Sequence, residues 1–185
     1  MGKTKKTLVI HPDDRTTDFL CHIYEDIRNK TVIRMGVSQK DIRKLIKSHD
    51  RIIMLGHGCQ LGLFSLGMFP GSSGCVIDIN MVNVLKEKSD CYYIWCNADK
   101  FVDYWELKGF YSGMFISEVG EAYWFNIVTN QDVVNESNYT FSEILSKYIK
   151  RPIKQTHKKV IQQYGELVQS NPVVSYNHQR LYLRV

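Results

Sequence analysis

A histidine and a cysteine each follow a strongly apolar run, and these two side chains together have the chemistry to cleave an acyl bond. His57 comes after residues 51–56, and Cys96 comes after residues 91–95. A thiol attacks a carbonyl carbon only as the thiolate, and a neighbouring imidazole can supply the base that this requires. If both runs are neighbouring parallel strands, their carboxyl ends meet where open α/β folds place their ligands. The pattern predicts a Cys–His dyad at that edge.

Gly58 directly follows the histidine and suits the rest of such a site. Without a Cβ, its backbone N–H can approach a substrate oxygen closely, and with the N–H of Cys96 it could form an oxyanion hole. Each residue taken singly has a simpler interpretation. A cysteine at the end of a buried strand is often a core residue, and His-Gly after a strand is commonly a turn.

The segments around these residues alternate between strand-like and helix-like patterns. Apolar or β-branched runs predict strands at residues 7–10, 31–35, 51–56 and 91–95. Apolar residues at helical spacing predict helices over residues 16–27, 38–46, 81–88 and 98–107. This order predicts an α/β fold with a mainly parallel sheet and helices on both faces.

The remaining segments are less regular. The glycine-rich residues 56–74 predict a hairpin or an ordered loop, followed by a short strand at 76–78. A further strand is expected at 113–119 and an edge strand at 180–185, and the last third of the chain is expected to be largely helical. No repeat or linker divides the chain, so residues 1–185 are expected to form one domain.

Composition narrows the class of protein. The 185 residues are 44% hydrophobic and carry a formal charge of +5, spread in modest clusters without a nucleic-acid-binding motif, so no nucleic-acid partner is expected. No apolar run is long enough to span a membrane, and no export signal is visible. The five cysteines are therefore expected to be reduced thiols in a cytoplasmic protein. Neither a cofactor nor a metal is expected, and homo-oligomer formation stays open.

An apolar run with His-Gly, a spacer of about forty residues, then an apolar run with Cys resembles the signature of the caspase-like cysteine peptidases. This group includes caspases, legumains, clostripains and gingipains, and the resemblance covers roughly residues 4–121. It implies a three-layer fold in which the dyad follows the third and fourth strands of a six-stranded sheet. His57 would be the base, Cys96 the nucleophile and Gly58 N–H an oxyanion donor, acting on a peptide or protein.

The sequence departs from that family immediately before the nucleophile. Members often carry a small residue there, preceded by an acidic or amide residue, whereas this chain has Trp95 and Ile94. Cleavage specificity is therefore open. By the same resemblance Ser117 and Glu118 are candidates for the substrate pocket, although a helix start with Ser117 as its cap is the simpler interpretation. Asp99 could point into the cleft or lie in an exposed first helical turn.

Two other functions compete with the hydrolase. Trp95 beside the nucleophile position, and the short chain, are also consistent with a non-catalytic caspase-like or flavodoxin-like binding module. His11-Pro-Asp-Asp14 resembles the zinc-binding opening of sugar deacetylases of the LmbE type. A zinc hydrolase using His11 and Asp14 would need a third ligand, and the usual downstream His-x-x-His is missing. A turn leading into a helix is the simpler interpretation of those residues.

Overall fold

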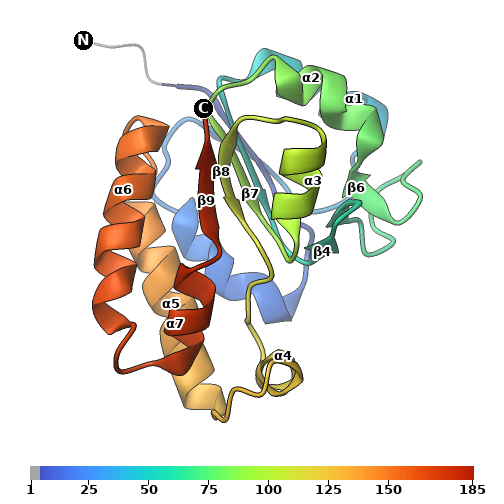
Figure 1. Ribbon diagram of the computed structural model, residues 1–185. Helices are drawn as coiled ribbons and strands as arrows, with labels where there is room; N and C mark the ends of the chain where they lie inside the picture. Colours follow the sequence, from blue (N-terminus) through green and yellow to red (C-terminus); the bar gives the residue numbers. More distant parts are fainter. Residues whose placement is uncertain (1–4) are drawn as a thin grey trace.

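The computed structural model describes residues 5–185, and its centre is a six-stranded sheet with the strand order β2-β1-β3-β7-β8-β9 (Figure 1). The strands are β1 (Thr7–Ile10), β2 (Lys30–Ile33), β3 (Arg51–Leu55), β7 (Cys91–Ile94), β8 (Gly109–Ser112) and β9 (Leu181–Arg184). The first five are parallel to their neighbours, and β9 runs antiparallel to β8 at the edge. The expected mainly parallel sheet with a carboxyl-terminal edge strand is confirmed.

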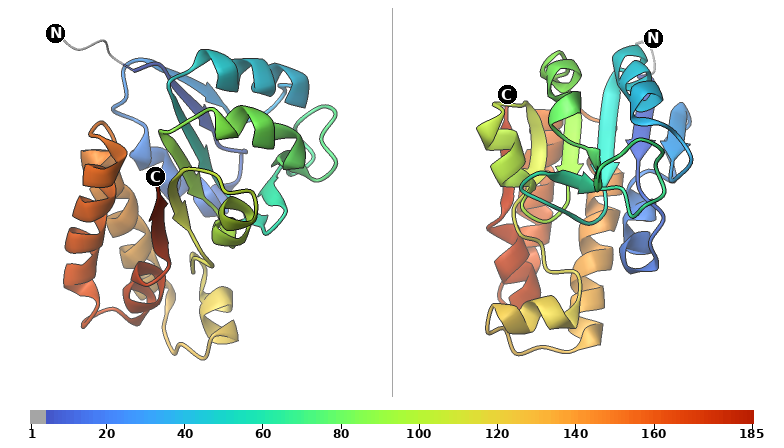
Figure 2. Two further views of the ribbon diagram at one scale, coloured as in Figure 1. Left: turned by 45° about the horizontal axis from the view of Figure 1, so that its top comes forward. Right: turned by 90° about the vertical axis from the view of Figure 1, so that its right-hand side faces the viewer.

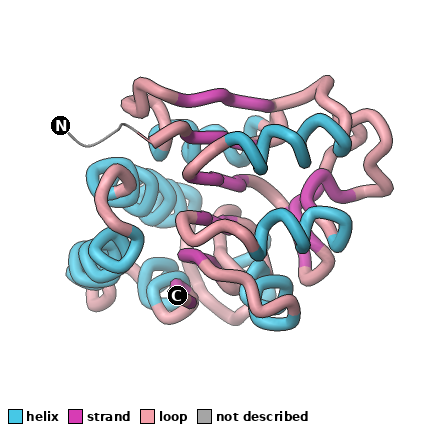
Figure 3. Tube along the Cα trace, turned by 90° about the horizontal axis from the view of Figure 1, so that it is seen from above, coloured by secondary structure: helices cyan, strands magenta, loops and turns pink. Residues whose placement is uncertain are grey.

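Helices cover both faces of this sheet (Figure 3). One face is covered by α1 (Gln39–Ser48), α2 (Val82–Lys86) and α3 (Ala98–Tyr104), and the other by the 3-10 helix η1 (Arg15–Ile23), α5 (Gln131–Tyr148) and α6 (Ile153–Tyr164). Because side chains alternate along a strand, Tyr93 and Trp95 pack toward Phe101 of α3, whereas Tyr92 and Ile94 pack with the core around Phe141 of α5. Burial on both faces explains why the central strands are continuous apolar runs.

The glycine-rich segment forms a second, small sheet beside the carboxyl ends of the strands (Figure 2). Its antiparallel strands are β4 (Gly58–Cys59), β5 (Gly62–Phe64) and β6 (Cys75–Ile77). The predicted hairpin is therefore confirmed, and the short strand expected at 76–78 belongs to this sheet. The short helices η2 (Ile79–Met81), α4 (Val119–Trp124), η3 (Gly165–Leu167) and α7 (Pro172–His178) complete the chain.

Two of the predicted elements need correction. The segment at 16–27 is a 3-10 helix that ends at Ile23 rather than a longer α-helix. The strand predicted over 113–119 is wrong, since β8 ends at Ser112 and an irregular loop follows. Ile116 has no strand partner because the Asn177 side chain takes that role, accepting from its N–H at 2.8 Å and donating to its carbonyl at 2.9 Å. The apolar Phe115 instead packs on Phe141.

Among the helices in residues 5–185, none combines the length and the apolar character that crossing a membrane would require.

Candidate active site

The two strands that precede His57 and Cys96 are direct neighbours. β3 and β7 pair in parallel register, with Leu55 opposite Ile94, and Gly56 N–H extends the ladder by donating to Ile94 O at 3.1 Å. The predicted meeting of the two strand ends at one edge is thus confirmed. His57 and Cys96 both line one hollow of about 20 Å³ together with Phe115 and Ser117. That volume holds about one water molecule and leaves no room for a peptide.

The segment after β1 positions the His57 ring through Thr16 and Asp14. Its Nε2 lies 2.6 Å from Thr16 Oγ1, and Thr16 Oγ1 lies 2.8 Å from Asp14 Oδ1. When the Thr16 hydroxyl donates to the Asp14 carboxylate, its oxygen accepts the Nε2–H of His57. That tautomer leaves Nδ1 with a free lone pair, which is the arrangement a general base requires.

Asp14 is fixed by the start of η1. It is the N-cap residue of that helix, and its carboxylate accepts the backbone N–H of Thr16 at 2.9 Å. Partial burial acts to raise the pKa of Asp14, but the Thr16 hydrogen bonds and the nearby His57 outweigh it and lower the pKa. Asp14 Oδ2 lies 3.9 Å from His57 Nε2, close enough to stabilise a protonated ring. The turn expected at residues 12–16 is confirmed, and it also orients the histidine.

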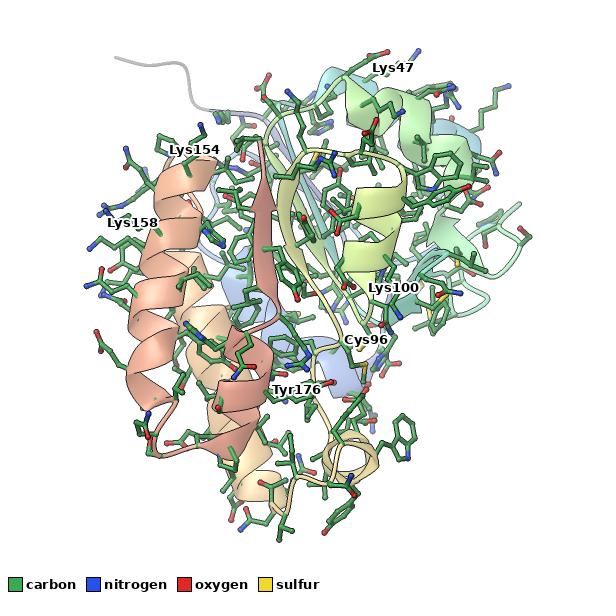
Figure 4. All side chains as sticks on the ribbon, viewed as in Figure 1. Lys47, Cys96, Lys100, Lys154, Lys158 and Tyr176 are labelled. Carbon is green, nitrogen blue, oxygen red and sulfur yellow. The ribbon has the colours of Figure 1, made fainter. Side chains whose placement is uncertain are left out.

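The Cys96 side chain has two polar neighbours. Its Sγ–H donates to Phe115 O at 3.4 Å, and Sγ lies 3.9 Å from Glu121 Oε1. Burial and the adjacent Glu121 carboxylate raise the pKa of Cys96 to about 12. In Figure 4 the cysteine lies at the lower end of the sheet, beside the loop that leads to α4. Burial and the Glu121 carboxylate therefore both disfavour formation of the Cys96 thiolate.

Glu121 and Thr16 are the two residues of this site that the sequence pattern does not reveal. Glu121 belongs to a capping box at the start of α4, and its Oε2 accepts from Ser117 N at 2.8 Å and from Ser117 Oγ at 3.1 Å. The only sequence signal is the pair of glutamates three positions apart, which predicts a helix start. Thr16 is 41 positions from His57 and Glu121 is 25 positions from Cys96, so only the fold brings each pair together.

Gly58, predicted as an oxyanion donor, has a packing role in the structure. A Cβ at this position would lie 2.3 Å from Trp95 Cδ1 and 2.6 Å from Gly62 O. The Trp95 ring therefore packs directly on the glycine, and its Nε1–H donates to Cys59 O at 3.1 Å. Because Phe64 N–H donates to His57 O, the next pair, Gly58 with Leu63, is a non-hydrogen-bonded pair, and Gly58 N–H points away from β5.

The three residues predicted to line the substrate pocket, Ser117, Glu118 and Asp99, lie in three different places. Ser117 lines the hollow, with its backbone and hydroxyl donating to Glu121. Glu118 is the N-cap of α4, a role that the helix-start interpretation gave to Ser117, and it borders a neighbouring depression of about 270 Å³. Asp99 lies in the first turn of α3 and does not line the hollow.

The zinc alternative finds little support in the geometry around His11. This residue is fully buried, and its two ring nitrogens lie 3.0 Å from Tyr24 OH and 3.1 Å from Thr17 Oγ1. Burial lowers the pKa of His11 to about 4, so the ring is neutral, but both nitrogens are already engaged. Within the described part of the chain, no three His, Cys, Asp or Glu side chains come together as a metal site would need.

Comparison of the sequence with models of known protein families gives no match, and comparison with curated proteins gives none either. The resemblance to caspase-like peptidases therefore rests on the residue pattern alone.

Proposed function

We propose that this protein is a cysteine hydrolase that cleaves peptide bonds with Cys96 as the nucleophile and His57 as the base, in the manner of the caspase-like peptidases. The observation that carries the proposal is the shared hollow, which both side chains line from the ends of two paired parallel strands. The hydrogen bond that His57 Nε2–H donates to Thr16 Oγ1 adds support, because a ring in the core would not need to be oriented with Nδ1 free.

The chemistry follows from the tautomer. As Cys96 Sγ attacks the substrate carbonyl carbon, the thiol proton passes to His57 Nδ1, and the Sγ–C bond forms. His57 then gives this proton to the leaving amine as the C–N bond breaks, and water hydrolyses the thioester to release the acid and restore the thiol. Asp14, acting through Thr16, stabilises the imidazolium in between. Thr16 is in this scheme a positioning residue.

The oxyanion of the tetrahedral intermediate needs donors on the same side. Gly58 N–H points away from β5, and it could act with the N–H of Cys96. The adjoining 270 Å³ depression provides the space for a substrate side chain, and it is lined by Arg15, Asp18 and Glu118 among other polar residues. Ser117 lies on the border between the depression and the hollow.

Glu121 keeps the site in a resting state. Its carboxylate stands beside the sulfur, so a negative charge must leave or be neutralised before the thiolate can form. Replacing Glu121 by Gln keeps the hydrogen-bond acceptor for Ser117 and removes the charge. We expect Glu121→Gln to lower the pKa of Cys96 and to raise its alkylation rate with iodoacetamide by about tenfold at neutral pH.

The decisive experiment combines alkylation of Cys96, followed by mass spectrometry, with turnover of a broad peptide library. We expect cleavage by the wild type or by Glu121→Gln, with a loss of at least about a thousandfold in Cys96→Ala and His57→Ala. Cys59→Ala is the matched control, since this cysteine is also partly exposed but lies outside the hollow. Thr16→Val should lower kcat and shift the pH profile without changing KM. Cleavage that persists in both dyad variants would refute the mechanism.

The second candidate is a non-catalytic binding module of the same fold. It is favoured by the size of the hollow and by a thiol pKa of about 12, both of which describe a site that is not ready to react. If Glu121→Gln leaves the alkylation rate of Cys96 unchanged and no library peptide is cleaved, this function replaces the hydrolase.

A further inference from the structure

A wide cavity opens at the amino ends of the strands, at the opposite end of the sheet from Cys96. It has a volume of about 620 Å³, and Thr7 and Arg51, the first residues of β1 and β3, form part of its lining. In Figure 1 this is the upper end of the sheet, where α6 begins, whereas Figure 4 shows Cys96 at the lower end in the same view. The volume lies in the range typical of small-molecule sites.

The charges around this cavity are mostly positive. Five cationic side chains line it, from four separate segments: Lys5, Arg28, Arg51, Lys150 and Arg151. Asp26 is the one acidic residue in the lining, and Asp90 lies behind Arg51. Asp90 pairs with Lys5 and Arg51, so Arg28, Lys150 and Arg151 are the exposed cations whose mutual repulsion a bound anion would relieve.

The floor of the cavity holds polar groups that are buried but incompletely satisfied. Thr7 is fully buried, and its Oγ1 has no hydrogen-bond partner among residues 5–185. Arg51 is 3% exposed and donates from Nε to Asp90 Oδ2 at 3.1 Å. Its Nη2 lies 3.0 Å from the same oxygen but has no well-directed acceptor in the described chain. Asp90 Oδ1 is likewise buried without a hydrogen-bond partner in the described chain, so the layer beneath the cavity holds unsatisfied donors and an unsatisfied acceptor.

The amino end of α6 adds a third, independent feature. Its N-cap is Pro152, which lines the cavity, and no side chain caps this end of the 12-residue helix. The first N–H groups of a helix carry a partial positive charge and readily bind phosphate oxygens. Ile27 and Pro152 add apolar surface to the same cavity. The ligand that fits is therefore anionic at one end and apolar or aromatic at the other.

We propose that this cavity binds a phosphorylated small molecule with an apolar or aromatic body, such as a nucleoside phosphate. The phosphates lie against Arg28, Lys150 and Arg151, beside the amino end of α6. The site is separate from the hollow of His57 and Cys96, and it stands whether or not the chain is a hydrolase.

The test measures binding of ATP and of inorganic pyrophosphate by isothermal titration calorimetry at low ionic strength. The triple variant Arg28→Gln, Lys150→Gln, Arg151→Gln removes three cations that are exposed and so should not affect folding. The control variant Lys47→Gln, Lys86→Gln, Lys158→Gln removes the same charge from exposed positions outside the cavity, two of which are labelled in Figure 4.

We expect ATP to bind the wild type and the control variant within about twofold of each other, and to bind the triple variant at least about tenfold more weakly. Pyrophosphate should bind more weakly than ATP, because it lacks the body that contacts the apolar wall. The proposal fails if ATP gives no binding up to about 1 mM, or if both triple variants weaken it equally. It also fails if a single-stranded oligonucleotide binds more tightly than ATP through the same three cations.

Discussion

The two ends of the large sheet handle their polar groups in opposite ways. At the carboxyl ends of the strands, His57, Thr16 and Asp14 satisfy one another, Cys96 donates to a carbonyl, and a hollow of about 20 Å³ remains. At the amino ends, Thr7 Oγ1 is buried without a partner in the described chain, and five cations line a cavity of about 620 Å³. The carboxyl end is closed around His57 and Cys96, and the amino end is open and lined by cations. Catalysis requires side chains held in a fixed arrangement, as in a closed site, whereas binding of an ion requires an open space lined by charges.

The largest effect is expected at the open end, from the variant Asp90→Asn. Lys5 and Arg51 both pair with this carboxylate, and Arg51 is almost fully buried. Removing the charge leaves a buried cation uncompensated, so the free energy of unfolding should fall by about 3–5 kcal/mol in urea denaturation. Glu25→Gln, which breaks an exposed pair with His22, should cost at most about 1 kcal/mol. Equal losses in the two variants would contradict the proposed difference.

A smaller loss is expected at the closed end, from Gly58→Ala. The added Cβ collides with the Trp95 ring and with Gly62 O, so we expect the free energy of unfolding to drop by about 1–3 kcal/mol. Gly120→Ala is the control, because a Cβ there meets no atom within 4 Å. That change lies inside α4 and should be neutral or stabilising by up to about 1 kcal/mol. If Gly58→Ala is as well tolerated as the control, the packing of Trp95 on residue 58 is not tight.

The pH dependence of the free energy of unfolding tests the burial of His11, at the closed end of the sheet. The pKa of His11 falls from 6.5 in the unfolded chain to about 4 in the folded one, mainly because of burial. The unfolded state therefore takes up a proton first as the pH falls, and stability is lost between pH 6.5 and 4. From pH 7 to pH 5 this group contributes a loss of about 2 kcal/mol.

The measurement is urea denaturation at both pH values for the wild type and for His11→Gln. The variant should lose most of this pH slope, whatever its absolute stability, whereas His22→Gln should retain it. An unchanged slope in His11→Gln would show that other groups cause the acid sensitivity.

The mainly parallel sheet follows from the sequence because apolar runs of four to five residues alternate with helical segments. The neighbouring position of the strands before His57 and Cys96 was a condition of the dyad hypothesis, and the pairing of β3 with β7 fulfils it. The strand predicted at 113–119 failed because Phe115 and Ile116 are apolar for a different reason. They pack under helices, and the Asn177 amide satisfies the backbone of Ile116.

The partners that set the chemistry of the two residues could not be predicted. Thr16 lies 41 positions from His57, and Glu121 lies 25 positions from Cys96. Thr16 has a local role at the start of η1, and Glu121 has a local role in the capping box of α4. Local rules therefore explain why these residues occur, and only the tertiary structure shows that they also face the dyad.

The contact of Trp95 with Gly58 constrains how the hollow can widen. The indole ring joins the end of β7 to the β4 segment, by packing on Gly58 and by its bond to Cys59 O. The segments that carry His57 and Cys96 are thus joined in one wall of the hollow. The opposite wall consists of residues 113–118 and the six-residue helix α4, and side chains rather than a strand partner hold it: Asn177 binds Ile116, and Asn138 donates to Ser117 O. In the proposed hydrolase, a substrate that enters the hollow would displace part of this second wall and would move Glu121 away from the sulfur.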